Sequence, residues 1–324
     1  MEKLVSIVIP YYQDTAADLS VVLSSINNQV GIDFDQVEVI LVNDGGTPIH
    51  GRELFSYFSH LSIRTYHYPK NQGAGYARMV GTEAAVGKYV MYMDADDQFH
   101  YVGALLDFFN VVKYHGDHQI IIGAFMEESH RPDVGYRYYR HESHDWKSAY
   151  AKWFSQDYLR QIQLTWRSDL RVFEDTYFVG VACECASDIY YLDSVVYTWM
   201  WHPNTTVRKD GGKDFYHRLD QWALSHRASL EKIQQYRAKM LPFDFTNYMA
   251  DLYLREQLYP PLDADAYQRE QQKLLVEFSN LWLHTKTDLE RSVKKMMTTQ
   301  AQYVRFDTQK LPDFIRHQED LLGK

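Results

Sequence analysis

Three aspartates, Asp94, Asp96 and Asp97, end the stretch MYMDADD at residues 91–97. Carboxylates placed this closely repel one another unless a cation neutralises them. Hard oxygen ligands of this kind suit Mg²⁺ or Mn²⁺, which also hold substrate phosphates. The same residues equally fit a solvated acidic loop in which Asp97 caps the next helix. The stretch alone leaves both interpretations open.

Two other segments carry groups that suit a nucleotide. Asp44 is followed by Gly45 and Gly46, which permit a close approach of the backbone. A carboxylate at this point can accept a hydrogen bond from a base N–H. Tyr11 and Tyr12 offer rings on which a base can stack.

Residues 71–78, NQGAGYAR, place glycines and then Arg78 at the expected start of a helix. A helix N-terminus and a guanidinium both favour a phosphate nearby. The Gly-x-Gly-x-x-Arg pattern lacks the third glycine of a dinucleotide fingerprint, and it follows the third predicted strand rather than the first. The pattern therefore argues against a Rossmann dehydrogenase.

These residues follow short apolar runs that alternate with helical patterns. We predict strands over residues 4–9, 37–42, 63–68, 88–93 and 119–125. We predict helices near residues 19–30, 77–84 and 105–112. Such alternation predicts an α/β fold with a mainly parallel sheet flanked by helices. Ligands of such sheets bind beyond the carboxyl ends of the strands, where the segments above all converge.

The second half of the chain has a different pattern. Residues 131–146 are polar and aromatic, and we expect His141 and His144 to be loop residues. Beyond about residue 213 the apolar spacing becomes almost wholly helical, with helices expected up to Pro242 and over 244–258, 264–284 and 286–303. We therefore predict a first domain over residues 1–212, with halves at 1–100 and 101–212, and a helical module over 213–324.

Composition excludes several classes of protein. The 324 residues carry a formal net charge of -9 and no basic block, which argues against nucleic-acid binding. Cys183 and Cys185 are expected to be buried thiols in a reducing compartment. No stretch reaches the ~20 apolar residues of a transmembrane segment, and MEKLVSIVIP reads as a first strand. These features predict a soluble, cytoplasmic protein.

A family resemblance joins these segments. SIVIPYYQ, VNDGG, NQGAGYAR and MDADD, in this order and spacing, resemble a family 2 glycosyltransferase with the GT-A fold. The resemblance continues through RVFEDTYFVGVA at 171–182 and IYYLDSVVYTWMWHPNTT at 189–206, and so covers about residues 1–206. It implies a GT-A nucleotide-binding half, and the helical C-terminal module lies outside it.

The resemblance also implies roles for individual residues. It assigns nucleotide-sugar binding to Pro10, Tyr11, Asp44, Asn71, Gly73, Arg78, Asp94 and Ala95. It assigns metal binding to Asp96, Asp94 and His202, with Mn²⁺ or Mg²⁺ as the ion. Asp175 would be the general base, with Glu174 beside it.

Local alternatives stand beside these roles. Two acids at a helix start are ordinary capping chemistry, so Glu174 and Asp175 could serve the helix alone. Tyr197, Trp199 and Trp201 alternate as on a strand, and could either wall the acceptor site or simply pack.

Two departures from the family pattern refine the expectation. Gly46 stands where the family often has a serine, which removes one side-chain hydrogen bond. The Gln-x-x-Arg-Trp motif of the processive synthases is absent, since residues 163–167 read QLTWR. A non-processive enzyme is therefore expected.

The sequence predicts an inverting, metal-dependent glycosyltransferase that moves a sugar from a nucleotide-diphosphate sugar, with UDP the favoured nucleotide, to an acceptor hydroxyl. The acceptor could be a glycan, a wall polymer, a protein or a small molecule. One alternative is a non-catalytic sugar-nucleotide-binding subunit. Another is a sugar-phosphate nucleotidyltransferase, which usually has a Gly-rich loop where residues 11–14 read YYQD. The helical module could close the acceptor pocket, form a homo-oligomer or bind a partner.

Overall fold

The computed structural model describes residues 2–49, 51–203 and 205–323. The chain divides into two compact units, residues 1–202 and 203–324. The sequence pattern places a domain boundary after residue 212 instead. The difference arises because the short 3₁₀ turn η2 (Lys209–Gly212) contacts helix α7 (Lys213–Tyr216) and so belongs with the helices of the second unit.

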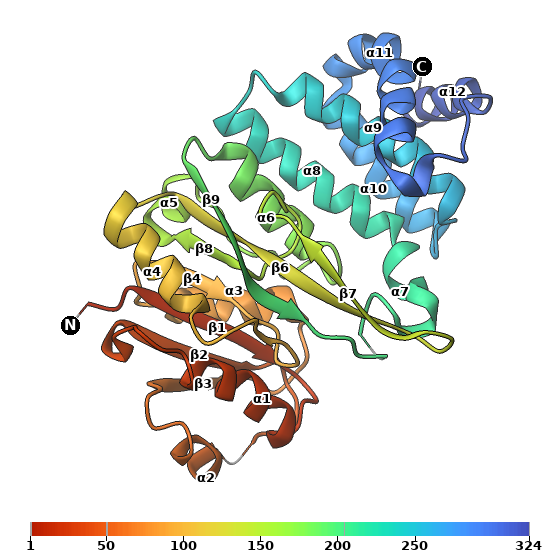
Figure 1. The fold of residues 1–324 in the computed structure, drawn as a ribbon. Coiled ribbons are helices and arrows are strands. Elements are labelled where there is room, and N and C mark those ends of the chain that lie inside the picture. Colours follow the sequence, from red (N-terminus) through yellow and green to blue (C-terminus); the bar gives the residue numbers. More distant parts are fainter. Residues whose placement is uncertain (1, 50, 204, 324) are drawn as a thin grey trace. The chain divides into compact units, whose positions relative to one another are not determined.

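The described part of the first unit is built around one sheet of nine strands (Figure 1). The strands are β1 (Val5–Tyr11), β2 (Val37–Asn43), β3 (Ile63–His67), β4 (Tyr89–Tyr92), β5 (Gln98–Phe99), β6 (Ile120–Arg131), β7 (Gly135–His141), β8 (Lys152–Ser155) and β9 (Ile189–Trp199). Their order is β3-β2-β1-β4-β8-β6-β9-β5, and β7 pairs with β6 outside this path. The helices are α1 (Ala16–Asn27), α2 (Gly51–Ser56), α3 (Ala74–Ala84), α4 (Ala104–His115), α5 (Gln156–Gln161) and α6 (Glu174–Cys185), with a 3₁₀ turn η1 (Phe34–Gln36).

The first four strands in this order, β3, β2, β1 and β4, are all parallel, as expected. Strands β1, β2 and β4 are buried along their whole length, which explains their nearly continuous apolar sequences. Alternate side chains of β1 join α1 and α4 in one core, whereas Val8 faces Gly81 of α3 on the other side. The α/β fold class is therefore confirmed.

The second half of the sheet is mixed. Strand β8 is antiparallel to both β4 and β6, whereas β6 and β9 run parallel. The expectation that His141 is a loop residue is wrong, because β7 forms a hairpin with β6, whereas His144 does lie in a turn. His141 lies in β7 and its Nε2 is 2.8 Å from Oε2 of Glu127. Alternating polar and aromatic residues concealed this strand, since both of its faces are largely exposed.

The second unit is helical. Its main helices are α8 (Leu219–Tyr236), α9 (Leu241–Leu258), α10 (Ala264–Glu277), α11 (Ser279–Thr299) and α12 (Leu311–Leu321), with a 3₁₀ turn η3 (Ala301–Tyr303). Helix α9 packs against α11, and α10 packs against α8 and α12. The single helix expected over 264–284 is divided at Phe278. Pro242, expected to end a helix, lies instead in the first turn of α9, where its missing N–H costs no helical hydrogen bond.

Among the helices within the described ranges, none combines the length and the apolar character that crossing a bilayer requires.

Candidate active site

The loops that follow β1, β2 and β3 approach one another at the carboxyl edge of the sheet. Gly46 lies so close to the chain after β1 that a Cβ atom would be 1.4 Å from the carbonyl oxygen of Tyr12. Gly45 has φ +74°, and a Cβ there would lie 2.4 Å from the backbone of Lys70. A serine at position 46 would therefore collide with the neighbouring backbone. The departure from the family pattern has this steric cause.

Asp44 follows β2 and holds the loop between β3 and α3. The side chain of Asp44 is buried and accepts four hydrogen bonds of 2.7–2.8 Å, from the Tyr68 hydroxyl, the Asn71 amide and the backbone N–H groups of Gln72 and Gly73. A carboxylate has about four acceptor positions, so all of them are used. Any base that binds Asp44 must therefore replace one of these donors.

The acidic stretch after β4 separates into three different environments. One oxygen of Asp94 accepts a hydrogen bond from Arg78 at 2.8 Å. Asp97 is buried and accepts hydrogen bonds of 2.7 Å from the Tyr197 hydroxyl and from the N–H of Met200. Helix α4 begins only after Gly103, so the alternative of Asp97 as a helix cap is wrong. Burial, followed by Asp94 and Asp96, raises the pKa of Asp97 well above its ordinary value.

The side chain of Asp96 is 34% exposed, much like the 35% of Asp94, whereas Asp97 is buried. Burial and the neighbouring Asp94 raise the pKa of the Asp96 carboxyl to about 6, and His202 acts in the opposite direction. The Nε2 atom of His202 lies 3.1 Å from the backbone oxygen of Asp96 and 3.9 Å from its carboxylate. The structure therefore brings Asp96 and His202 together, whereas Asp94 turns one oxygen to Arg78.

A divalent ion would find a small donor set here. In the part of the chain that the structure describes, no three His, Cys, Asp or Glu side chains form a metal-binding group. Mg²⁺ commonly uses only one or two protein carboxylates and completes its shell with substrate phosphates and water. The Asp96 carboxylate and the His202 imidazole fit such an ion. The diphosphate of a substrate would then complete its coordination shell.

Arg78 connects the acidic stretch with the start of α6. The side chain is buried, and its two terminal nitrogens lie 2.8 Å from Asp94 and 3.0 Å from Glu174. The guanidinium also lies over the ring of Trp166, with 5.1 Å between its carbon and the ring centroid. Positions 94 and 174 are thus joined through one arginine, although eighty residues separate them in the sequence.

Asp175 lies next to this arginine bridge, in the first turn of α6. Its Oδ1 accepts a hydrogen bond of 2.7 Å from the N–H of Thr176. Burial first and the charge of Glu174 second raise the pKa of Asp175 to about 7, while Arg78 opposes the shift. Because the carboxylate of Glu174 is taken up by Arg78, helix capping alone does not explain this acidic pair. A carboxyl group with a pKa near neutrality suits general acid–base chemistry.

Comparison with known proteins identifies the family. The sequence profile described as Glycosyl transferase family 2 matches residues 6–179, more than half of the chain. The chain belongs to glycosyltransferase family 2. Curated relatives agree: a 97-residue segment is 34% identical to the uncharacterized glycosyltransferase YibD of Escherichia coli, and a 93-residue segment is 31% identical to the putative glycosyltransferase EpsH of Bacillus subtilis. Each match spans 29% of this chain and 26% of the relative.

Solved structures show the same fold over nearly the whole chain. TarS of S. aureus, residues 1–349 in complex with UDP, superposes with a TM-score of 0.63 at 15% identity, covering 98% of this chain and 90% of that one. The complex of the same fragment with UDP-GlcNAc gives 0.65 at 16% identity and covers 94% of each chain. Because only 15–16% of the residues are identical, these superpositions show a shared fold and nothing more.

Other predicted residues of this glycosyltransferase have mixed accessibility. Pro10, Tyr11 and Ala95 are buried, whereas the ring of Tyr12 is 40% exposed. Tyr12 therefore offers more ring surface to a base than Tyr11 does. Asn71 spans Asp44 and Arg171, since its oxygen accepts a hydrogen bond of 2.8 Å from Arg171.

Sequence reasoning missed several contributors to this site. Asp14 precedes Thr15, the residue that caps α1. Burial first, and then Asp18 and Asp94, raise the pKa of Asp14, which places its charge near the acidic stretch. Tyr197 supports the same stretch, because its hydroxyl also accepts a hydrogen bond of 3.1 Å from the N–H of Asp94. The alternation that includes Tyr197 was a usable signal, whereas nothing in the sequence singled out Asp14.

Proposed function

We propose that this enzyme is an inverting, divalent-metal-dependent glycosyltransferase that uses a nucleotide-diphosphate sugar, with UDP as the favoured nucleotide. The supporting observation is the Arg78 bridge from Asp94 to Glu174, which joins the acidic stretch to the residue before Asp175. The UDP and UDP-GlcNAc bound by the TarS fragment support the choice of nucleotide through fold similarity alone.

The reaction would be a single displacement. Asp175 accepts the proton of the acceptor hydroxyl as its oxygen forms a bond to the anomeric carbon. The bond from that carbon to the diphosphate oxygen breaks, and its electron pair leaves with the diphosphate. Attack from the face opposite the leaving group inverts the configuration. An ion held by Asp96 and His202, when bound, offsets the negative charge of the diphosphate.

Arg78 acts in this proposal as a positioning residue. Its terminal nitrogens are committed to Asp94 and Glu174, so we assign it to holding the two acidic segments together rather than to clamping phosphate. Asp44 has a similar role toward the loop at residues 70–73, and any contact with the base is additional. Gly73, with φ +98°, brings that loop to the N-terminus of α3.

We also propose that the enzyme transfers one sugar per encounter with its acceptor. Residues 163–167, QLTWR, have the order of Trp and Arg opposite to that in the processive motif. Trp166 is buried and stacks on Phe178 with 4.1 Å between ring centroids, so it serves packing beneath Arg78.

A donor screen tests the proposal. Purified enzyme with Mn²⁺ is offered UDP-sugars and GDP-sugars, and nucleotide release is measured with and without a mixture of oligosaccharide acceptors. We expect release from a UDP-sugar, with a product of inverted anomeric configuration by NMR. Tight binding of UDP without release from any donor would instead support the non-catalytic subunit. Retention of configuration would refute the single displacement.

A further inference from the structure

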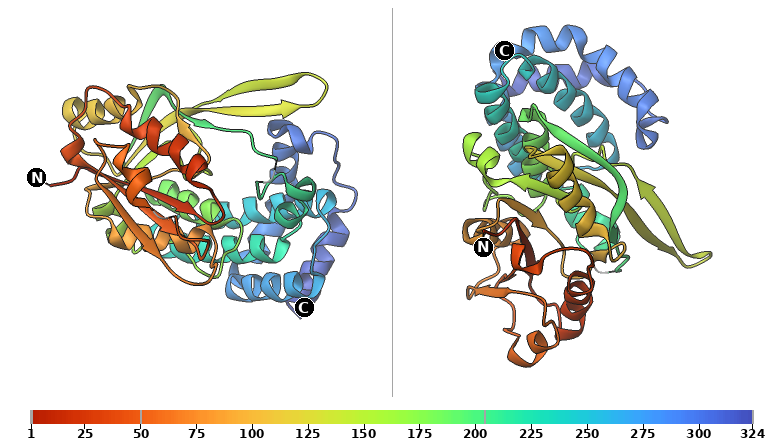
Figure 2. Two further views of the ribbon diagram at one scale, coloured as in Figure 1. Left: turned by 90° about the horizontal axis from the view of Figure 1, so that it is seen from below. Right: turned by 60° about the vertical axis from the view of Figure 1, so that its left-hand side comes forward.

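The hairpin of β6 and β7 extends beyond the rest of the sheet in the first unit (Figure 2). Strand pairing continues from Phe125 opposite His141 to Arg131 opposite Gly135. Tyr136, Tyr138 and Tyr139 of β7 are 55%, 59% and 52% exposed. Exposed aromatic rings in a row indicate an interaction surface rather than a core.

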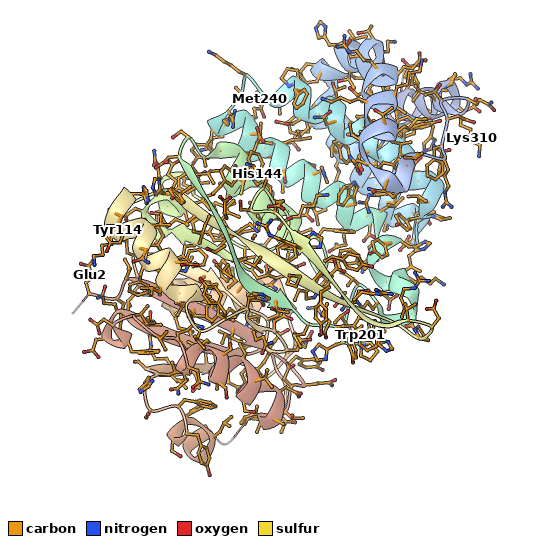
Figure 3. All side chains as sticks on the ribbon, in the orientation of Figure 1. Glu2, Tyr114, His144, Trp201, Met240 and Lys310 are labelled. Carbon is orange, nitrogen blue, oxygen red and sulfur yellow. The ribbon has the colours of Figure 1, made fainter. Side chains whose placement is uncertain are left out.

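Strand alternation divides these tyrosines between two faces. Tyr136 and Tyr138 share one face with their cross-strand partners His130 and Glu128, whereas Tyr139 lies on the opposite face. Trp201, labelled in Figure 3, joins the first face, with ring centroids 4.9 Å from His130 and 6.4 Å from Tyr136. We call the three rings of His130, Tyr136 and Trp201 the aromatic platform.

Glu128 fixes the platform in place. This carboxylate is only 7% exposed and accepts hydrogen bonds from the Tyr138 hydroxyl at 2.8 Å and from the N–H of Trp201 at 3.2 Å. It thereby ties the segment after β9 to the hairpin. A surface held in advance loses less entropy when a ligand binds.

The chain leads directly from the platform to the candidate active site. Trp201 lies between Met200, whose N–H donates to Asp97, and His202, whose Nε2 approaches Asp96. A chain-like ligand whose end is at the acidic stretch could therefore extend along the aromatic rings.

Charge indicates what kind of ligand fits. Arg131 pairs with Asp133 at 3.3 Å, and Arg140 pairs with Glu142 at 3.0 Å. Arg137 lies two positions before Tyr139 and shares its face, opposite the platform. Because the arginines nearest the platform are neutralised, the surface suits uncharged rings better than a polyanion. Flat aromatic rings stack well on the apolar faces of pyranoses.

We propose that the aromatic platform binds the sugar rings of a neutral glycan acceptor, beyond the residue that receives the transferred sugar. The proposal rests on the proposed function for the position of the reacting end. It distinguishes a neutral glycan from the wall-polymer, protein and small-molecule acceptors that the sequence left open.

Tyr136 and Tyr139 provide a matched pair of variants, because they are the same residue on the same strand with nearly equal exposure. Binding is measured by saturation-transfer NMR with oligomers of glucose, galactose, mannose and N-acetylglucosamine. Inorganic polyphosphate and carboxymethylated lactalbumin serve as anionic and protein probes. For the best-bound oligosaccharide, we expect Tyr136→Ala to weaken affinity and raise the acceptor KM by about fivefold to tenfold. Tyr139→Ala should stay within about twofold of wild type.

Two further measurements separate binding from damage. Tyr136→Phe keeps the ring and should retain the affinity that Tyr136→Ala loses. Nucleotide release without an acceptor should be the same in all three variants, because neither Tyr136 nor Tyr139 is among the residues predicted to bind the donor.

Three results would overturn the proposal. Tyr136→Ala and Tyr139→Ala could lose the same affinity, no neutral oligosaccharide could bind, or only polyphosphate or lactalbumin could bind. If wild type binds an oligosaccharide through Tyr136 yet releases nucleotide from no donor, the platform stands and the proposed function fails. If transfer occurs but Tyr136→Ala transfers normally, the proposed function stands and the platform is wrong.

Discussion

Each unit of this glycosyltransferase contains a carboxyl group whose pKa is raised to about 7, Asp175 in α6 and Glu256 in α9. Burial is the largest cause in both. Their neighbours differ, because Asp175 interacts with the charges of Glu174, Arg78 and Asp94, whereas Glu256 accepts a hydrogen bond from the neutral Tyr267 hydroxyl. A raised pKa by itself therefore indicates burial. It is the charged groups of Glu174, Arg78 and Asp94 around Asp175 that make this residue a candidate for chemistry.

Replacing the two carboxyl groups should separate their roles most strongly. Asp175→Asn removes the proton acceptor and should lower kcat by about 10²–10⁴-fold. Glu256→Gln, the matched control, should leave kcat within about twofold of wild type. Nucleotide release from the best donor measures both. Near wild-type turnover in a folded Asp175→Asn protein would rule out this residue as the base.

Removal of the metal ligand should have the next largest effect. Asp96→Ala should lower kcat/KM by about a hundredfold at low Mn²⁺, and chelation with EDTA should abolish turnover of the wild-type enzyme. Asp117→Asn is the control, since Asp117 forms an exposed ion pair with Lys88. Nucleotide release is followed while Mn²⁺ is titrated. Full activity in EDTA would contradict metal dependence.

The dependence of kcat/KM on pH tests the role of Asp175 in the first unit. Asp175 accepts a proton only when ionised, so kcat/KM should fall about tenfold for each pH unit below an apparent pKa near 7. The value belongs to the pair with Glu174, because the two acids interact. We expect Glu174→Gln to lower this apparent pKa by removing a negative neighbour. If the fall of kcat/KM at low pH occurred at the same pH in Glu174→Gln as in wild type, the interaction between Glu174 and Asp175 would be contradicted.

The sequence predicted the parallel half of the sheet well, because buried parallel strands are continuous apolar runs that end in polar loops. It also placed Glu174 and Asp175 at a helix start and Asp96 in a loop after a strand. It could not predict that Asp44 has four donors, since Tyr68 and residues 71–73 meet it only through loop geometry. The β6–β7 hairpin was missed because its exposed strand lacks an apolar face.

In the second unit, pH should act on stability instead of activity. The pKa of Glu256 is raised from 4.5 to about 7 by folding, so its ionisation opposes the folded state. Its stabilising contribution is full below pH 4.5 and is lost as pH rises through 7, by about 3 kcal/mol at most. The thermal unfolding midpoint measured at pH 5 and pH 8 should differ less in Glu256→Gln than in wild type. An unchanged difference would assign the pH dependence to other groups.

The smallest effects come from single buried hydroxyls, one in each unit. Tyr68→Phe removes one of the four donors to Asp44, and Tyr248→Phe removes a 2.5 Å hydrogen bond to the oxygen of Gln271. Each should lower the free energy of unfolding by about 1 kcal/mol. Only Tyr68→Phe should weaken UDP binding, by roughly threefold, because the loop that Asp44 holds leads to the N-terminus of α3. Calorimetry with UDP measures this difference. If both variants bind UDP like wild type, the hydrogen bonds at Asp44 serve folding alone, and the contrast between the two units is limited to Asp175 and its charged neighbours.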